Sequence, residues 1–366
     1  MRLYKQLIKA YLIKKILNNL GGIFLILSII LLGNQFFLVL SQTINHGIYS
    51  SELIPLMFLK WVRDIPFLLG FSFVLSLSHS LNQLYKNSEM VIFNSAGIGN
   101  IAIYKKISSL ILLISLFVLI FTNFITPYAK YEIEKIKNEA SLRPDYIFLK
   151  EGVFQNFRKN DTTFYSSAIE DVNNSENQKL KNIFIFSESN NKLILAREGF
   201  KKVFDEERKV ILELSDGNIY ESFLSPNPRV TNFKLYAMNL VDDNKNDLLH
   251  IINAEQKSTI DLIKDSNSNN FSEMQLRFSL PLSIMILSLT VIFFSKTSSR
   301  SKRNFSLAYA TTFYFVYYNL MIFITDLIQN SETNLDSISL LPHLIFVILN
   351  ITIYFIKDKP TINKAL

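Results

Sequence analysis

Six long apolar runs dominate the pattern of hydrophobic and polar positions along the chain. They lie at residues 16–40, 53–81, 107–125, 276–294, 305–327 and 338–355. A helix needs about 20 mostly apolar residues to cross a hydrocarbon core ~30 Å thick, so the pattern predicts six transmembrane helices. The first run is too long for the apolar part of a secretory signal, and no small-residue cleavage site follows it. We therefore expect the first run to be a retained membrane helix.

A long polar stretch separates the third run from the fourth. Asp216-Gly217 within it is typical of a hairpin turn. Many short strands with few helices are typical of a β-sandwich or a jelly-roll-like domain. The predicted fold class is membrane α-helical, with six transmembrane helices (3+3) and an inserted periplasmic all-β jellyroll-like domain. The predicted strands, which show alternating hydrophobicity, are 146–157, 162–169, 182–187, 192–197, 209–214, 218–223 and 230–236.

These patterns predict four regions along the chain. Residues 1–140 hold a basic amphipathic helix expected to lie in the membrane interface, the first three spans and a charged helical stalk. Residues 141–240 form the β domain. Residues 241–274 form a return linker that includes a polar helix, and residues 275–366 hold the last three spans.

The positive charge is unevenly distributed along the chain. Residues 127–272 contain 20 Lys and Arg against 23 Asp and Glu, whereas the whole chain has a net charge of +7. The membrane part therefore carries the excess of basic residues, which favours topology and anionic lipid over nucleic acid as the explanation. The N-terminus, the loops after the second and fourth spans and the C-terminus are all basic. This distribution predicts both termini in the cytoplasm and the β domain outside.

Residues 84–99 stand out among the short inner loops because they contain Glu89, the single acid of those loops. We expect a short amphipathic helix at 86–98, with Met90, Ile92, Phe93 and Ala96 on one face. No G-x-x-x-x-G-K-[ST] motif occurs, so the chain lacks a P-loop of its own. A surface helix between two spans suits docking of a separate ATPase. The alternative is an acid that only complements the helix dipole.

Other chemistry is sparse in the sequence. The chain has no Cys and four scattered His, so we expect no metal site, no cofactor and no catalytic residue. In the second span, Lys60 and Asp64 are four residues apart and are predicted to pair on one helix face, beside Arg63. This group either snorkels to the interface or lines a substrate cavity. Aromatic residues of the fifth span either face that cavity or pack against other helices.

The stretch Leu84-Tyr85-Lys86-Asn87-Ser88-Glu89-Met90, with Ser95-Ala96-Gly97, resembles the L-Y-x-x-S-E-h…A/C-G signature of the LptF/LptG permease family. These proteins are the membrane subunits of the lipopolysaccharide export ABC transporter. The resemblance covers essentially the whole chain, and it is closer to LptF than to LptG. It includes Gly152-Val153-Phe154, Val230-Thr231-Asn232-Phe233 and Arg277.

The resemblance implies a permease subunit that takes lipopolysaccharide from the inner membrane of a Gram-negative bacterium and passes it to a periplasmic bridge. The implied partners are an LptB-like ATPase dimer, an LptG-like permease in a heterodimer, an LptC-like protein and lipopolysaccharide, without nucleic acid. Glu89 would be the principal polar contact with the ATPase. The residues implied in ATPase coupling are Ser88, Glu89, Met90, Phe93, Ala96 and Gly97.

One departure from the family concerns the outer half of the first span. Members of the family often carry Lys or Arg there, whereas this chain has uncharged Asn34 and Gln35. Either the lipid of this organism has fewer phosphates, or cations of the second span, such as Lys60 and Arg63, compensate. The resulting candidates for lipid contact are Asn34, Gln35, Phe37, Lys60, Arg63, Tyr314, Tyr317 and Tyr318. The alternative functions are a membrane-anchored periplasmic ligand-binding scaffold and a permease for another lipid or lipoprotein. A sensor would need a cytoplasmic output domain, and the longest predicted inner segment has about 20 residues, too few for a folded domain.

Overall fold

The structure is a computed structural model, and the chain divides into a helical unit and a sheet unit. The helical unit comprises Met1–Leu38, Ile54–Ile133 and Ile252–Leu366, and the sheet unit comprises Val39–Leu53 and Glu134–Ile251. The residues described are 2–46, 49–141, 151–157, 162–172, 177–187, 191–204, 209–222, 229–239, 253–265, 267–295, 305–330 and 336–358.

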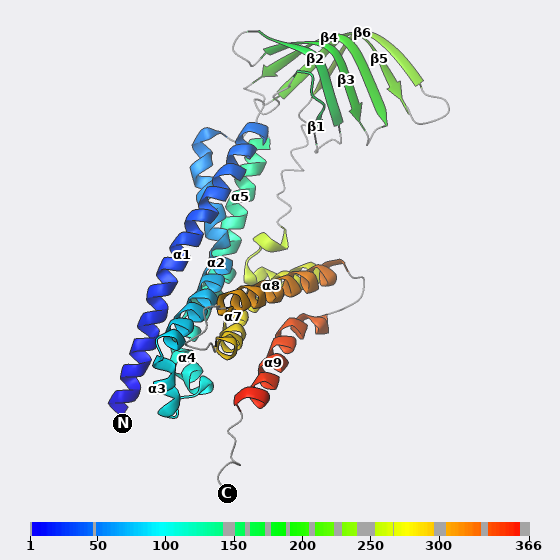
Figure 1. Cartoon of the computed structure of the whole chain (residues 1–366). Coiled ribbons are helices and arrows are strands. Elements are labelled where there is room, and N and C mark those ends of the chain that lie inside the picture. Colours follow the sequence, from blue (N-terminus) through cyan, green and yellow to red (C-terminus); the bar gives the residue numbers. More distant parts are fainter. Residues whose placement is uncertain are drawn as a thin grey trace. The chain divides into compact units, whose positions relative to one another are not determined.

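Among the described residues, six helices are long and apolar enough to cross a membrane, as the sequence predicts. The helices of the chain are α1 (Arg2–His46), α2 (Ser50–Lys86), α3 (Glu89–Ser95), α4 (Asn100–Ile120), α5 (Thr126–Ser141), α6 (Thr259–Lys264), α7 (Ser268–Phe294), α8 (Ser306–Asn330) and α9 (Leu341–Ile353) (Figure 1). Helix α7 packs against α4, α8 and α9, which makes it central to the second half of the helical unit.

Helix α1 begins at Arg2 and continues without a break through the first span. The separate interfacial helix predicted for the first 15 residues is therefore the first part of α1. Its apolar stripe, which includes Ile8, Leu12 and Ile16, is buried against the protein core instead of facing lipid. Farther along, Leu25 and Ile29 are 58% and 61% exposed, as expected for side chains that face lipid tails or another subunit.

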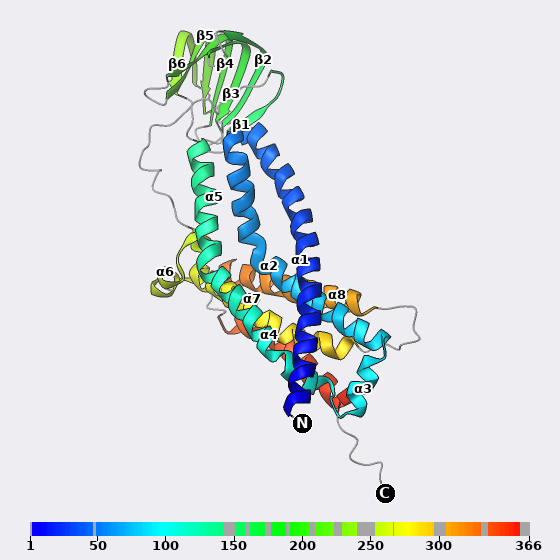
Figure 2. The same ribbon diagram turned by 90° about the vertical axis from the view of Figure 1, so that its left-hand side faces the viewer.

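Helices α4 and α5 are joined by a π-helical turn, Phe121–Ile125. Pro127 follows two residues later, and its ring nitrogen has no N–H to give to the helix ladder. A wider turn at this position accommodates the missing hydrogen bond, and such turns often mark functional sites. The third span and the predicted charged stalk thus form one helical rod (Figure 2).

The described residues of the sheet unit form one antiparallel sheet whose six strands pair in chain order. The inserted all-β domain is therefore confirmed, with an up-and-down strand order among the described residues. One face is apolar and includes Phe164, Ile183 and Leu212. The strands are β1 (Gln155–Phe157), β2 (Thr162–Val172), β3 (Asn177–Ser187), β4 (Lys192–Phe204), β5 (Lys209–Glu221) and β6 (Arg229–Asn239).

The hairpin predicted at Asp216-Gly217 is wrong, because both residues lie inside the continuous strand β5. Asp216 has a φ of 53°, which shifts the inward-facing positions by one residue. A Cβ on Gly217 would lie 2.3 Å from the carbonyl oxygen of Leu195, so glycine is required where the strands approach closely. Asn182 of β3 also has a positive φ, of 49°. These positions put a crease across the sheet.

Candidate functional site

Helix α3 is the short helix predicted between the second and third spans, and it is shorter than the predicted range 86–98. A left-handed residue, Ser88 with a φ of 60°, separates it from α2. At its other end Gly97 has a φ of 78°. The Gly97 N–H donates to Asn94 O and the Ile98 N–H donates to Phe93 O, at 3.0 and 2.8 Å. This pair of bonds is a Schellman motif, which fixes where α3 ends.

The two faces of α3 have different surroundings. Met90 and Phe93 are 1% and 9% exposed and belong to the core of the helical unit. Ile92, predicted on the same face, instead points outward with Val91, and these two side chains are 61% and 63% exposed. Met90 and Phe93 therefore anchor the helix, and the outward face is available to another protein. The other predicted coupling residues, Ser88, Ala96 and Gly97, are exposed.

Glu89 is engaged by residues of its own chain. The Tyr11 hydroxyl of α1 donates to Glu89 Oε2 at 2.7 Å, and Asn87 Nδ2 donates to Glu89 Oε1 at 3.2 Å. Lys15 Nζ lies 3.4 Å from Glu89 Oε1. Partial burial by itself raises the pKa of Glu89. The hydrogen bonds from Tyr11 and Asn87 and the Lys15 charge together outweigh this effect, so the pKa of Glu89 is below its ordinary value. We call Tyr11, Lys15 and Glu89 the α1–α3 clasp.

The sequence alone did not indicate that Tyr11 and Lys15 of α1 are the partners of Glu89. Tyr11 and Lys15 are four residues apart, so they share one face of α1. Lys15 Nζ also lies 5.5 Å from the centre of the Tyr11 ring. The spacing was visible in the sequence, but the acid that these residues meet is more than 70 positions away.

Polar residues of α1 and α2 meet farther along the two helices. Gln35 is 6% exposed and donates to Asp64 Oδ2 at 3.0 Å. Among the described residues, Asp64 pairs with Arg63, at 2.8 Å, instead of the predicted partner Lys60. Lys60 is 5% exposed and has its own polar interaction. Two predicted lipid contacts, Asn34 and Phe37, lie on the exposed side of α1.

The three tyrosines of α8 fall into two groups. Tyr314 and Tyr317 are 2% and 1% exposed. The Tyr314 hydroxyl donates to Phe67 O at 2.9 Å, whereas Tyr317 is hydrogen-bonded to His343 of α9. These two residues take part in helix packing. Tyr318 is partly exposed, and its ring centre lies 4.5 Å from that of Phe67.

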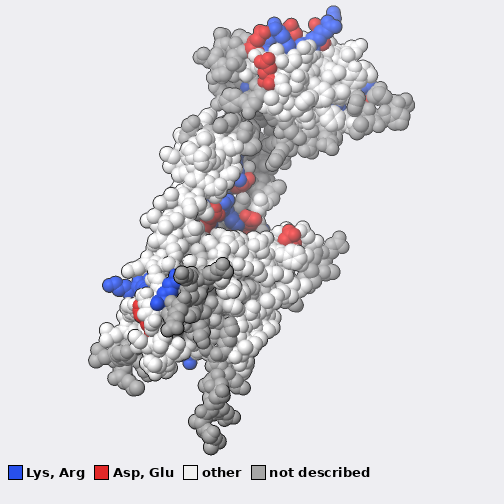
Figure 3. Space-filling model, in the orientation of Figure 1, with Lys and Arg blue, Asp and Glu red and all other residues white. Residues whose placement is uncertain are grey.

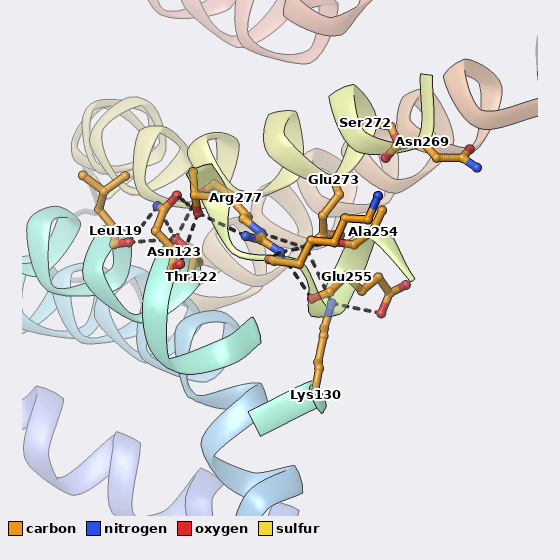
Figure 4. Close-up of polar contacts among 12 residues, drawn as sticks. Leu119, Thr122, Asn123, Lys130, Ala254, Glu255, Asn269, Ser272, Glu273 and Arg277 are labelled. Carbon is orange, nitrogen blue, oxygen red and sulfur yellow. Dashed lines mark hydrogen bonds and ion pairs between the residues drawn. The ribbon is translucent and has the colours of Figure 1, made fainter. Parts of the chain in front are cut away.

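A second polar cluster surrounds Arg277 of α7, which is 3% exposed (Figure 4). Its Nε donates to Glu273 Oε1 at 3.0 Å. Its Nη2 donates to the carbonyl oxygens of Glu255 and Lys257, at 3.2 and 3.0 Å, and its Nη1 donates to the Thr259 hydroxyl at 3.1 Å. One guanidinium thus binds the segment that precedes α6 to α7, and its charge is compensated by the adjacent carboxylate.

The same cluster reaches the π-helical turn between α4 and α5. The Thr122 hydroxyl donates to Arg277 O at 3.0 Å, and the Thr259 hydroxyl lies 3.0 Å from Asn123 Oδ1. Lys130 Nζ of α5 lies 3.0 Å from a carboxylate oxygen of Glu255. We call this group, with Glu273, the Arg277 network. Sequence reasoning singled out Arg277 only as a family match.

Charged side chains are collected in a few groups, and the helical surface seen in Figure 3 is mostly uncharged. Among the described residues, no three His, Asp or Glu side chains are placed to hold a metal ion. The arrangement thus provides an outward apolar helix face, held by the α1–α3 clasp, on a helical unit with lipid-facing surfaces.

Comparison with known proteins identifies the family. No curated protein matches the chain. The family described as Lipopolysaccharide export system permease LptF/LptG matches residues 10–356, nearly the whole length. The six apolar helices and the family agree on a multi-pass inner-membrane protein. The chain belongs to the LptF/LptG family of lipopolysaccharide export permeases.

Proposed function

We propose that this permease forms a heterodimer with an LptG-like subunit and is driven by an LptB-like ATPase dimer in the cytoplasm. It takes lipopolysaccharide from the inner membrane and passes it, with an LptC-like protein, to a periplasmic bridge. The observation that carries this proposal is the outward apolar face of α3, on a helix between two membrane spans. The ATPase docks on Val91 and Ile92, while Met90 and Phe93 hold α3 in the core.

The orientation follows from the distribution of basic residues. The N-terminus, the loops after the second and fourth spans and the C-terminus are basic, so they lie in the cytoplasm. This topology puts α3 on the ATPase side and the sheet unit in the periplasm. Helix α3 follows the second span, so it lies on the same side of a six-helix layout as the basic segments.

The lipid meets the outer part of the helical unit, where Gln35, Arg63 and Asp64 are linked. Arg63 keeps 33% of its side chain exposed, although it pairs with Asp64. An arginine of this kind can bind a phosphate oxygen with several N–H groups. Arg63 therefore substitutes for the cation that the family often carries in the first span. Tyr318, the partly exposed tyrosine of α8, is the second lipid contact.

The docking proposal is tested by placing a charge on the outward face of α3. In Ile92→Asp, an ionised carboxylate must be desolvated in the interface, so we expect about tenfold less ATPase to co-purify with the permease complex. Ile356→Asp is the matched control, because Ile356 is 75% exposed and lies outside α3. Equal ATPase recovery with both variants would contradict the docking site. Mass spectrometry of the co-purified lipid separates lipopolysaccharide export from transport of another lipid.

A further inference from the structure

Glu89, the acid expected to contact the ATPase, has both carboxylate oxygens occupied within the chain. Tyr11 donates to one oxygen at 2.7 Å, and the other lies 3.2 Å from Asn87 Nδ2 and 3.4 Å from Lys15 Nζ. Its side chain is 26% exposed, less than half the exposure of Val91 or Ile92. The Glu89 carboxylate therefore links α3 to α1 within this chain.

The apolar contacts join the same two helices. Ile8 and Leu12 of α1, which flank Tyr11 in sequence, are 6% and 1% exposed. They belong to one core cluster with Met90 and Phe93 of α3. Helices α1 and α3 thus contribute side chains to one apolar core, and the clasp adds a direct polar contact between them. Such a combination fixes the relative position of two helices, because the hydrogen bonds select one register within a permissive apolar contact.

The links from α3 to its neighbours in sequence are of another kind. Ser88 and Gly97 are single residues with φ values of 60° and 78° that end α2 and α3. Such short turns change direction by rotation at a few dihedral angles, which is how hinges work. The side chains of α1 hold α3 laterally, in addition to the two backbone turns that join it to α2 and α4.

We propose that Glu89 is a positioning residue that ties α3 to α1 through Tyr11 and Lys15, so that a displacement of α3 by the ATPase also displaces α1. This inference rests on the proposed docking of the ATPase on α3. It gives the outward residues Val91 and Ile92 the contact with the ATPase, and it gives Glu89 the transmission of movement.

Two hydrogen bonds next to the clasp join α1 to α2. Ser76 of α2 donates to Ile16 O at 2.6 Å, and Asn19 Nδ2 donates to the Ser80 hydroxyl at 2.8 Å. These contacts lie within two turns of Lys15. The next part of α1 is exposed at Leu25, so it is free to follow the anchored end. A shift at the clasp therefore appears farther along α1 as a change in its position relative to the other helices.

The experiment uses the absence of Cys in the chain, which allows spin labels at introduced cysteines only. Labels at L25C on α1 and I348C on α9 occupy side chains that are 58% and 61% exposed. The distance between the labels is measured in the assembled complex with and without a non-hydrolysable ATP analogue. We expect the nucleotide to change this distance in the parent, and we expect the change to be lost in Tyr11→Phe and Lys15→Met although the ATPase remains bound.

Two further variants make the result specific. Lys9→Met removes an exposed charge of α1 and should leave the nucleotide-dependent change intact. The charge exchange Lys15→Glu with Glu89→Lys should restore a change that either single variant loses. If Tyr11→Phe and Lys15→Met respond to nucleotide as the parent does, the clasp does not transmit movement and the inference is overturned. If the parent complex contains no ATPase, the proposed function itself fails, and the inference with it.

Discussion

The α1–α3 clasp and the Arg277 network are two polar clusters of one helical unit, and they differ most in their exposure. In the clasp, Lys15 and Glu89 have side-chain exposures of 16% and 26% and lie 3.4 Å apart. In the network, Arg277 and Glu273 have exposures of 3% and 7% and lie 3.0 Å apart. The same kind of ion pair is thus partly wet in one cluster and dry in the other.

The two clusters therefore serve different purposes. A partly exposed pair contributes little to stability and separates at little cost, whereas a buried pair is costly to break once formed. The network is therefore suited to hold α7, the π-helical turn and the segment before α6 in one fixed arrangement. The clasp is suited to a contact that shifts during each transport cycle.

The largest effect is expected from Arg277→Ala. It leaves the buried Glu273 carboxylate with Lys130 Nζ, at 3.8 Å, as its remaining cation. It also removes the donors to three carbonyl oxygens of the segment before α6, so we expect a loss of about 3 kcal/mol. Thermal unfolding of the detergent-purified permease measures this loss. Lys105→Ala, which removes an exposed charge, is the control. A transition temperature of Arg277→Ala equal to that of the control would show that the network does not hold the helices together.

A smaller loss is expected from Glu273→Gln. The amide keeps the size of the carboxylate and an acceptor for Arg277 Nε, but it removes the buried negative charge, so we expect a loss of about 1–3 kcal/mol. The same unfolding assay measures it. A loss larger than that of Arg277→Ala would mean that the arginine contributes little beyond this one contact.

Gly97→Ala should act next, on the end of α3. Gly97 has a φ of 78°, and an alanine in this conformation costs about 1–2 kcal/mol, although nothing lies within 4 Å of the added Cβ. We expect a modest loss of stability and a larger loss of ATPase co-purification, because the turn sets the direction of α3. Normal stability with normal ATPase recovery would show that the turn is not needed.

Tyr11→Phe is expected to lower the free energy of unfolding by about 0.5–1 kcal/mol, because the lost hydrogen bond is partly exposed. Its effect on transport should be far larger than on stability. The ratio of lipopolysaccharide released to ATP hydrolysed measures this separation. A parallel loss of stability and transport would assign the clasp the same purpose as the network.

The smallest effect is that of pH on the clasp. Because the pKa of Glu89 is lowered in the folded protein, its ionised form adds stability above the unfolded pKa of about 4.3. The groups that face its carboxylate are the Lys15 ammonium, the Tyr11 hydroxyl and the Asn87 amide. We expect the difference in unfolding between the parent and Glu89→Gln to be constant near neutral pH and to fade as the pH falls through the folded pKa. A difference that varies around pH 7 would contradict this assignment.

The membrane part of the fold was predictable because each span is a run of about 20 consecutive, mostly apolar residues. The faces of α3 were less predictable. Each residue turns the helix by about 100°, so Ile92 points about 200° away from Met90, although both are apolar. Both residues were assigned to one face because both are hydrophobic, whereas in the structure Met90 is buried and Ile92 is exposed.

The sheet shows a second limit of local reading. Asp216-Gly217 has the composition of a hairpin turn, but the neighbouring strands continue past it, and the close approach of Leu195 O is what requires Gly217. Tyr11 likewise meets Glu89, 78 positions away, and Arg277 binds the segment before α6, whereas its pairing with Glu273 is local. Such contacts leave no trace in the spacing of nearby residues, so they were found only in three dimensions.

An ATPase that acts on α3 is expected to drive lipopolysaccharide release. The most direct measurement is ATP-dependent release of lipopolysaccharide from vesicles that contain the permease with its partner subunits. We predict release by the parent and by Ile356→Asp, and loss of release in Ile92→Asp with the permease still inserted. Release by Ile92→Asp at the parent rate, or transfer of another lipid in place of lipopolysaccharide, would contradict the account.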